Sequence, residues 1–269
     1  MRISLIISTY NSPKALEACL HSVMKQTSNP YEVIIADDGS TDSTPEVIER
    51  FSRQVSFPVV HVWQKNEGFR LATIRNKAIA KAKGDYIVQI DGDILLHPEF
   101  IADHAAVARR GHFVCGSRVL IEKDLTGKIF ADPSITVTSW THGISNRKNA
   151  IRSIFLAKTI NLISPSKLKY RGCNMAFWRS DLLAVNGYDE SFLGWGCEDH
   201  DLVARLMNHR IKPLQVRHRA ICYHLWHPSS KKEDTFQRNN DLLEATRRDK
   251  RIRSNDGLDK YLNGDITLQ

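Results

Sequence analysis

The sequence predicts an α/β protein in which a mostly parallel sheet is covered by helices on both faces. Over residues 1–100, short apolar runs of strand length alternate with segments of helical periodicity. Strands joined through single helices need crossover connections, which make neighbouring strands parallel and bury both faces of the sheet. Polar loops with the sequences STYN, DDGSTD and DGD follow three of the strands. Ligands in open α/β sheets bind beyond the carboxyl ends of the strands, so we expect these loops to form one crevice.

The elements of the first hundred residues follow from periodicity and from residues that begin or end helices. We expect strands at 3–8, 31–36, 57–63 and 85–90, and helices at 11–27, 45–53 and 71–84. Ser12 and Thr44 suit the N-cap position, and Pro13 and Pro45 suit the first helical position after each of them. Gly84 is of the residue type that most often stops a helix, so we expect the third helix to end there.

The elements after residue 100 are signalled less regularly. We expect strands at VCGSRVLIE (114–122), CNMAFW (173–178) and AICYHLWH (220–227), and a helix at EDHDLVARLMNHR (198–210). The inner face of that helix should carry Leu202, Val203, Leu206 and Met207. Residues 151–163 have helical length with Lys158 inside an apolar stripe, which fits either an amphipathic surface helix or a buried connector. From residue 229 the chain is rich in charge of both signs, and we expect a helix and a loose end.

The positive charge of the chain is concentrated in one stretch. The sequence has 38 basic and 30 acidic residues, a net charge of +8. Residues 133–180, called here the basic band, contain no Asp or Glu, and their eight cations equal the whole excess: Arg147, Lys148, Arg152, Lys158, Lys167, Lys169, Arg171 and Arg179. The basic band indicates either an acidic partner, such as anionic lipid or a charged acceptor, or a solvated face with scattered cations.

Composition also bears on location and partners. No apolar run approaches the ~18 residues of a membrane span, and the N-terminal apolar run is too short for a signal peptide. The five cysteines are odd in number, widely spaced and without a C-x-x-C pair, which is typical of reduced thiols in a cytosolic protein. We therefore expect a cytoplasmic protein, and further expect the basic band to give it peripheral contact with the inner face of the cell membrane. Nucleic-acid binding is not expected, because no known module is present.

Two aspartates close the strand YIVQI. Side chains alternate along a strand, so Asp91 and Asp93 should point the same way. Carboxylates held side by side repel each other unless a positive charge lies between or in front of them. A divalent cation bound to a nucleotide diphosphate would supply that charge. The alternative is an exposed Asp-Gly turn that needs no ligand.

These motifs resemble a known family. ISLIISTYN, VIIADDGSTDST and GDYIVQIDGD resemble the donor-binding half of the family 2 glycosyltransferases, which have a GT-A fold. GYDESFLGWGCEDHDLVARL is similar to the acceptor segment of the β-1,4-galactosyltransferase group, as also found in bacterial chondroitin-type polymerases. The resemblance covers roughly residues 1–100 and 170–230. It implies a single domain of two fused lobes, with a donor lobe at 1–115, an acceptor and catalytic lobe at 116–228, and a charged tail at 229–269.

The resemblance implies a metal site. Asp93 would ligate Mn²⁺ or Mg²⁺, hard cations that take oxygen ligands, and Asp91 would lie near the ribose. A metal-ligating histidine is expected just before a KKE-like polar segment, and HPSSKKED places His227 there. Neighbouring family members favour His224 instead, and no methionine precedes the histidine pair at ligand spacing, so the choice between the two stays open.

The resemblance also implies how a UDP-sugar donor is bound. Asp38 would face the uracil edge, and Ser8 and Tyr10 would flank the base, with Tyr10 offering a stacking face. Arg75 could reach the diphosphate, because a guanidinium suits phosphate oxygens. A solvated helix arginine is the other interpretation of Arg75.

The GWGCED segment is the expected acceptor corner. Trp195 between two glycines can offer its ring to a sugar face. Glu198 and Asp199 open a helix whose dipole favours ionised carboxylates, as a general base requires. We expect Asp199 to be the catalytic base and Glu198 to orient the acceptor, with Asn174 lining the same pocket. Ordinary helix capping by the two acids is the alternative.

Together these expectations describe an inverting, metal-dependent glycosyltransferase. It would move a hexose or N-acetylhexosamine from a UDP-sugar to a hydroxyl of a growing glycan or glycolipid of the lipopolysaccharide or capsule type. A nucleotidyltransferase is one alternative, but STYN lacks the Gly-rich, basic phosphate loop of that class. A non-catalytic binder of polyanions or sugar nucleotides is another, and Asp93 together with Asp199 argues against it.

Overall fold

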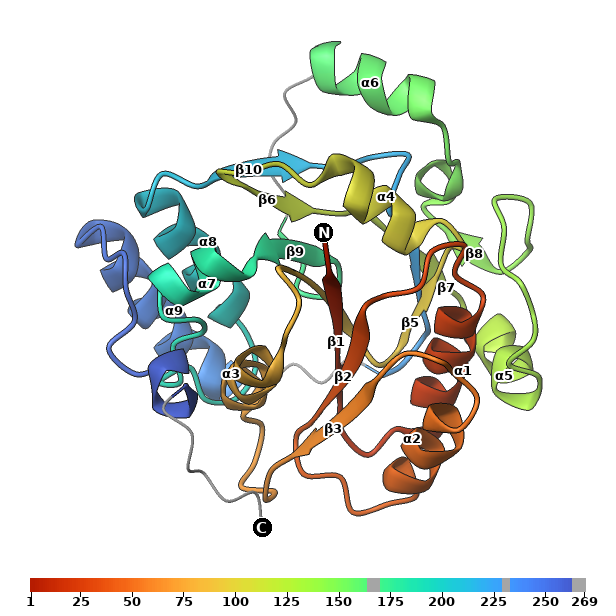
Figure 1. The fold of residues 1–269 in the computed structure, drawn as a ribbon, viewed down its shortest axis with the longest axis horizontal. Helices are drawn as coiled ribbons and strands as arrows, with labels where there is room; N and C mark the ends of the chain where they lie inside the picture. The colour runs from red at the N-terminus through yellow and green to blue at the C-terminus, as the bar shows by residue number, and fades with distance from the viewer. Residues whose placement is uncertain (164–169, 229–232, 263–269) are drawn as a thin grey trace.

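The computed structural model describes residues 1–163, 170–228 and 233–262. Most elements of the chain are labelled in Figure 1. In order they are β1 (Ile3–Thr9), α1 (Pro13–Met24), β2 (Glu32–Asp37), α2 (Thr44–Ser52), β3 (Val59–Trp63), α3 (Leu71–Lys81), β4 (Tyr86–Asp91), β5 (Ile94–Leu96), α4 (Phe100–Val107), β6 (His112–Cys115), β7 (Arg118–Ile121), α5 (Lys123–Ala131), β8 (Ile144–Ser145), η1 (Arg147–Ala150), α6 (Ile154–Ile163), β9 (Met175–Trp178), α7 (Arg179–Ala184), α8 (Glu198–Asn208), β10 (Lys212–Gln215), β11 (Cys222–His224), α9 (Glu233–Arg248) and η2 (Leu258–Tyr261).

A seven-stranded sheet forms the centre of the molecule, in the order β10-β6-β9-β4-β1-β2-β3. Pairs β4-β1, β1-β2, β2-β3 and β10-β6 are parallel, whereas β9 runs antiparallel to β4 and β6. Helices α1, α2 and α4 pack on one face, and α3, α7 and α8 on the other (Figure 1). The prediction of a mostly parallel sheet covered on both faces is confirmed.

Alternation along β1 shows how the sequence builds both cores. Leu5 and Ile7 belong to the core under α1 and α2, while Ile6 belongs to the core under α3. All three side chains are 0% exposed. A strand buried on both faces reads as a continuous apolar run, which is why ISLIIS was recognisable in the sequence.

A second sheet of four strands, in the order β5-β11-β7-β8, stands beside the first. Val119 of β7 and Tyr223 of β11 pack in a core beneath α1 and α5. Strands β7 and β11 are parallel, and their register pairs Arg118 with Cys222 and Leu120 with His224. Successive side chains of a strand point to opposite faces. Because Val119 and Tyr223 face that core, their neighbours Arg118, Leu120 and His224 lie on the opposite face of the sheet.

The expected single strand at 114–122 is wrong, because the chain turns between β6 and β7 and changes sheet. At the turn, Gly116 lies so close to the Asn174 side chain that a Cβ atom there would collide with it. Apolar residues lie on both sides of Gly116, so the sequence pattern is that of one strand and does not reveal the turn.

Smaller differences concern helix ends. The N-cap of α2 is Ser43 rather than Thr44, and neither α1 nor α2 has a side-chain hydrogen bond at its cap. Helix α3 ends at Lys81 rather than Gly84, because Ala82 is already extended with ψ of 131°. Met207, expected on the inner face of α8, is 44% exposed.

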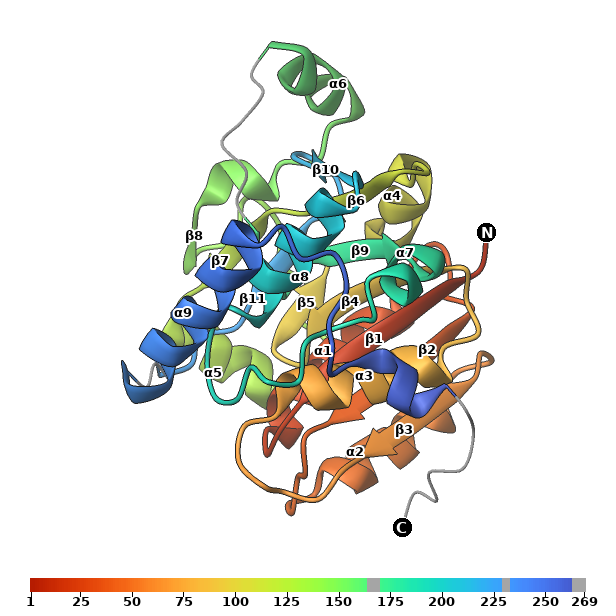
Figure 2. The same ribbon diagram turned by 90° about the vertical axis from the view of Figure 1, so that its left-hand side faces the viewer.

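Residues 154–163 form the expected helix, α6, but it is not a buried connector. It projects from the body of the molecule in both views (Figures 1 and 2). Ile154, Phe155 and Leu156 are 46%, 76% and 37% exposed, and Lys158 is exposed as well. In the described part of the chain, no helix has the length and apolarity to cross a membrane.

The basic band is only partly free. Arg152 is bound to Asp103 at 2.8 Å, and Arg147 donates to the Ser139 and Thr141 carbonyls. Lys167 and Lys169 lie outside the described residues.

Residues 233–262 pack on the body of the molecule, where a helix followed by a loose end was expected. Helix α9 lies along α8 (Figure 2), where Thr246 donates to the buried Asp201 at 2.6 Å. Leu258 of η2 is fully buried in the core under α3. The five cysteines of the chain are free and buried.

Candidate active site

A cleft of about 840 Å³ opens at the carboxyl ends of β1, β2 and β4. Its opposite wall comes from β7, β11, the start of α8 and α9. The cleft is lined by every expected site residue except Asn174: Ser8, Tyr10, Asp38, Arg75, Asp91, Asp93, Trp195, Glu198, Asp199, His224 and His227. The polar loops therefore meet as the parallel-sheet argument required.

Arg75 lies at the centre of this cleft and joins its two sides. Its side chain is 1% exposed. Nη2 is 3.0 Å from Asp91 Oδ1, and Nη1 is 2.9 Å from Asp199 Oδ1 and 3.4 Å from Glu198 Oε1. Nε donates to Ser8 Oγ at 3.3 Å. All three guanidinium nitrogens thus have protein partners, which accounts for the burial of this charge. The expected contact with a diphosphate would have to compete with three carboxylates.

The carboxylates around Arg75 are unequal in their tendency to ionise. Burial and the charge of Asp199 raise the pKa of Glu198 to about 8, against the opposing effect of Arg75. Burial raises the pKa of Asp91 to about 6, again against Arg75. Because Glu198 prefers its proton near neutral pH, it can donate a hydrogen bond there, which suits the orienting role expected for it.

Asp93, His224 and His227 form a second cluster. Asp93 Oδ2 lies 3.5 Å from Nε2 of His224 and 3.3 Å from Nε2 of His227. One ligand atom from each residue fits within 4.8 Å of the others. Asp93 Oδ1 is buried without a hydrogen-bond partner among the described residues. An orphaned carboxylate oxygen beside two imidazoles is what a bound cation would satisfy, so these residues fit a divalent metal.

The two histidines differ in protonation. The hydrogen bond to Asp93 raises the pKa of His227 to about 9, whereas burial lowers the pKa of His224. Burial opposes ionisation of Asp93, but the hydrogen bond with His227 and the charges of both imidazoles outweigh it and lower the Asp93 pKa. Both histidines lie close enough to Asp93 to hold one cation together with it, so the geometry does not distinguish which of them is the principal metal ligand. Imidazole ligands suit Mn²⁺ better than Mg²⁺, which takes oxygen almost alone.

The far end of the cleft has the features expected for a nucleoside. Asp38 is 4% exposed, and the Arg70 backbone N–H donates to its Oδ2 at 2.9 Å. Burial raises the Asp38 pKa, against that hydrogen bond and one from Gln64. The Tyr10 ring is 44% exposed, and its hydroxyl accepts a hydrogen bond from Asn66 at 2.9 Å. An exposed ring fixed at its far end is able to stack on a base.

The corner that was expected to bind the acceptor is shaped by close approach of the backbone to side chains. Cys197, immediately before α8, has a left-handed backbone with φ of 72°, a conformation that is costly for a residue with a side chain. This turn directs Asp199 toward Arg75 and toward Gly172, where a Cβ atom would collide with Oδ2 of Asp199. The Tyr188 hydroxyl lies 3.3 Å from Oδ1 of Asp199. Trp195 lines the cleft, and its ring centroid is 5.9 Å from that of Phe236 on α9.

Asn174 is the expected site residue that the structure places elsewhere. It is 0% exposed and does not line the cleft. Its Nδ2 donates to the carbonyls of Ser117 and Ala220, and its Oδ1 lies 3.1 Å from His104 Nε2. An amide with both ends satisfied inside the protein holds the β6–β7 turn against the start of β11, so the acceptor role expected for Asn174 is wrong.

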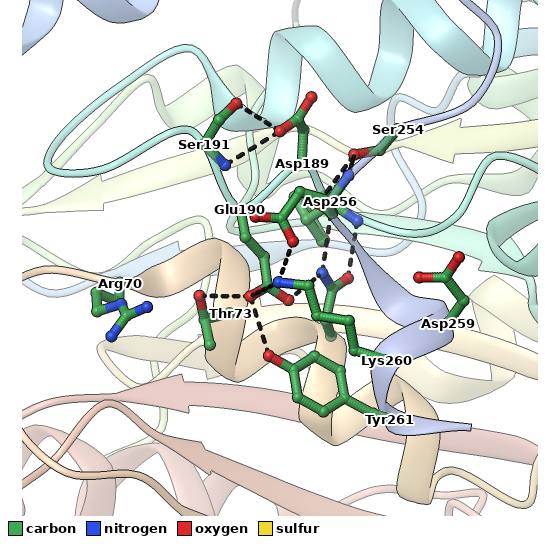
Figure 3. Close-up of polar contacts among 12 residues, drawn as sticks. Arg70, Thr73, Asp189, Glu190, Ser191, Ser254, Asp256, Asp259, Lys260 and Tyr261 are labelled. Carbon is green, nitrogen blue, oxygen red and sulfur yellow. Dashed lines mark hydrogen bonds and ion pairs between the residues drawn. The ribbon is translucent and has the colours of Figure 1, made fainter. Parts of the chain in front are cut away.

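A polar network behind the cleft supports the loop that leads to Trp195, and the sequence did not reveal it (Figure 3). Glu190 is 6% exposed and accepts hydrogen bonds from Thr73 at 3.1 Å and from Tyr261 at 2.9 Å. Lys260 lies 3.3 Å from the same carboxylate. Asn76 donates to Glu190 at 2.9 Å. The loop before Trp195 is thereby tied to α3, which carries Arg75, and to η2.

The cleft and its surroundings also contain residues that the sequence did not suggest. Tyr188, Arg118, Arg171 and Arg247 belong to the cleft or contact its carboxylates. Tyr188 stands inside the quoted acceptor motif, so that motif could have revealed it. The three arginines lie in no motif, and only the tertiary fold brings them to the cleft.

Comparison with protein families decides where the chain belongs. The family described as glycosyl transferase family 2 matches residues 4–183, more than half of the chain. This chain is a family 2 glycosyltransferase. The description "N-terminal domain of galactosyltransferase" matches residues 160–228 of the same chain, the segment that carries Trp195 and Asp199. Both halves of the resemblance seen in the sequence are confirmed.

Individual relatives share the same stretch of chain. Chondroitin synthase of Escherichia coli is 28% identical over 251 residues, covering 86% of this chain and 36% of that protein. Chondroitin synthase of Pasteurella multocida is 26% identical over 220 residues, covering 76% of this chain and 23% of that protein. The chain thus spans 36% of the length of the first of these relatives and 23% of the second.

Solved structures of similar shape confirm the GT-A fold of this family 2 glycosyltransferase. GalNAc-T7 with UDP, GalNAc and Mn²⁺ superimposes with a TM-score of 0.66 at 16% identity, over 91% of this chain and 48% of that one. S. aureus TarS 1–349 in complex with UDP superimposes with a TM-score of 0.63 at 17% identity, over 97% and 68% of the two chains.

Proposed function

We propose that this protein is a metal-dependent inverting glycosyltransferase that uses a UDP-sugar. The observation that carries the proposal is the arrangement of one cleft. A cluster that fits a divalent cation, Asp93 with His224 and His227, lies on one side of Arg75, and the Asp199 carboxylate lies on the other. Solved relatives of the same fold hold UDP and Mn²⁺, which supports the donor and the metal.

In the proposed reaction, the acceptor oxygen forms a bond to the anomeric carbon as the bond from that carbon to the diphosphate oxygen breaks. Asp199 accepts the proton of the attacking hydroxyl, and the electron pair of the broken bond leaves with the diphosphate. A positioned base typically contributes 10²–10⁴-fold to such a step. When bound, the metal acts as a Lewis acid on the diphosphate. Arg75 keeps the base oriented and holds Asp91 beside the donor end of the cleft.

The donor is proposed to lie along the β1–β4 edge. The nucleoside would be bound by Asp38 and Tyr10, with Ser8 near the base and Asp91 near the ribose. The sugar would then lie between Asp93 and Asp199, with Trp195 offering a ring to the acceptor and Glu198 orienting it.

The proposed acceptor is a growing surface glycan of the lipopolysaccharide or capsule type, made on the cytoplasmic side, and the proposed sugar is a hexose or N-acetylhexosamine. Similarity to chondroitin synthases supports a glycan acceptor. Within the proposal, residues 1–115 bind the donor, and residues 116–228 bind the acceptor and carry the catalytic base. Of the charged tail at 229–269, helix α9 lines the cleft. Strand β9, from the second of these parts, completes the large sheet, so the lobes share one core.

We further propose that α6 and its neighbourhood contact an anionic membrane. Phe155 is 76% exposed and Trp140 is 86% exposed. Arg147, Lys148 and Lys158 are exposed in the same acid-free stretch of sequence. Apolar and cationic side chains together are the composition of a helix that binds in the membrane interface.

The decisive experiment is a screen of UDP-sugars for donor hydrolysis and transfer in the presence of Mn²⁺. We expect one or a few UDP-sugars to turn over, and excess EDTA to abolish turnover. Asp93→Asn should lose turnover together with most of the Mn²⁺-dependent affinity for UDP. Full activity in excess EDTA, or in Asp93→Asn, would contradict the metal-dependent proposal.

A further inference from the structure

Arg118 is placed beside the metal-binding cluster by the pairing of two strands. It opens β7 and lies opposite Cys222 of β11, two residues before His224. Leu120 and His224 form the next pair on the same face. Arg118, Leu120 and His224 line the cleft, and His227 lines the same cleft.

The surroundings of Arg118 lack a counter-charge. Among the described residues, no carboxylate forms an ion pair with it, and its Nε is buried without a hydrogen-bond partner. Its Nη1 lies 3.7 Å from the Cys173 thiol, which is a weak acceptor. Arg75 in the same cleft is bound by three carboxylates. A guanidinium left with an unsatisfied donor inside a cleft is costly unless a ligand accepts from it.

The chemistry of the missing acceptor follows from the position of Arg118. The charge would repel a bare cation held by Asp93 and the histidines, so the two positive groups are compatible only if an anion lies between them. A planar guanidinium binds phosphate oxygens through parallel hydrogen bonds. A departing nucleoside diphosphate carries more negative charge than one divalent cation offsets, and charge that builds in the transition state is best met by fixed donors.

We propose that Arg118 binds the diphosphate of the sugar nucleotide next to the metal and stabilises it as it departs. The inference rests on the proposed sugar-nucleotide transfer. It assigns to Arg118 the contact that the sequence had suggested for Arg75, whose nitrogens are bound by the protein. Arg118 is then a phosphate-binding residue, and Arg75 is a positioning residue for Asp199 and Asp91.

The test is calorimetric titration of the Mn²⁺-saturated protein with three probes: UDP, UMP and inorganic pyrophosphate. UMP keeps the base and one phosphate, and pyrophosphate keeps the diphosphate without the base. We expect Arg118→Gln to weaken UDP and pyrophosphate by about ten- to a hundredfold, the worth of a charged hydrogen bond, while UMP affinity changes little. Arg118→Lys, which keeps the charge but loses the fork, should fall between Arg118→Gln and wild type. Arg109→Gln is the matched control, because Arg109 is an exposed arginine outside the cleft.

The outcomes separate this inference from the proposed function. Unchanged UDP and pyrophosphate affinity in Arg118→Gln would overturn the assignment, and so would an equal loss for all three probes. If wild type fails to bind UDP but its pyrophosphate affinity depends on Arg118, the uridine donor is wrong while the phosphate-binding role stands. If Arg118→Gln does not fold, Arg118→Lys provides the test. Undiminished pyrophosphate affinity in Arg118→Lys would overturn the proposal that the guanidinium forms parallel hydrogen bonds to phosphate oxygens.

Discussion

Replacing Arg75 with methionine should destabilise the protein severely, because it removes one cation from among three carboxylates. The side chains of Asp91, Glu198 and Asp199 are 34%, 11% and 19% exposed, so water can compensate only in part. Removing one partner of a buried ion pair costs about 3–5 kcal/mol. For a chain of this size, each kcal/mol corresponds to roughly 2–4 °C, so the unfolding temperature should fall by roughly 6–20 °C.

The loss should depend on pH in a defined direction. Burial already raises the pKa values of Asp91 and Glu198, and without the opposing charge of Arg75 they rise further above those of the unfolded chain. The unfolded chain then releases protons that the folded variant retains, so the stability of the variant falls as pH rises through the acidic range. The difference from wild type should therefore be larger at about pH 8 than at about pH 5.

Urea unfolding at both pH values measures this difference, with Arg109→Met as a control that removes an exposed arginine. A loss below about 1 kcal/mol at the higher pH, the size typical of surface ion pairs, would refute the view that Arg75 neutralises a buried cluster. A loss independent of pH would show that lost packing, not lost charge, causes it.

Further predictions concern the catalytic, metal and membrane residues. Asp199→Asn should lower kcat by at least about a hundredfold with donor affinity near wild type, and a dead Glu198→Gln beside an active Asp199→Asn would show that the roles are exchanged. The pKa of Glu198, about 8, lies above its ordinary 4.5, so the wild-type protein loses stability as pH rises through that range. Glu198→Gln does not titrate, and its stability relative to wild type should therefore increase over the same range, as measured by urea unfolding. A difference between the two proteins that stays constant with pH would contradict this. His227→Ala should weaken Mn²⁺ binding more than His224→Ala does, and the reverse order would make His224 the principal ligand. Phe155→Ser should reduce binding to anionic vesicles, and unaltered, salt-insensitive binding would remove α6 from the membrane proposal.

The first hundred residues could be predicted from sequence because their signals are local. Leu5, Ile6 and Ile7 are buried on two faces of one strand, so the apolar run marked the strand without knowledge of its neighbours. Asp91 and Asp93 could likewise be placed at the same end of the sheet, but β4 ends at Asp91, so strand alternation does not orient Asp93, which lies in the turn before β5. The convergence of the loops followed from the parallel arrangement alone.

The contacts that decide the chemistry are not local, and periodicity cannot reveal them. Arg75 meets Glu198 and Asp199 from more than a hundred residues away, and it was expected to bind phosphate or water instead. Asn174 stands near the acceptor motif in sequence, yet its amide is satisfied in the interior by the carbonyls of Ser117 and Ala220, which are distant in sequence. The sequence left α6 open between a surface helix and a buried connector, because an apolar helix has the same pattern whether protein or another phase covers it.

The sharing of one guanidinium by Asp91 and Asp199 couples the binding of ligands at the two ends of the cleft. A ligand that alters the charge felt by Asp91 also alters the hold of Arg75 on Asp199, so occupancy of one end of the cleft changes affinity at the other. Thermodynamic linkage makes this effect reciprocal, and couplings of this kind typically amount to about 1–3 kcal/mol. Because the coupling is reciprocal, a ligand at either end of the cleft should change the affinity of the other end by the same factor.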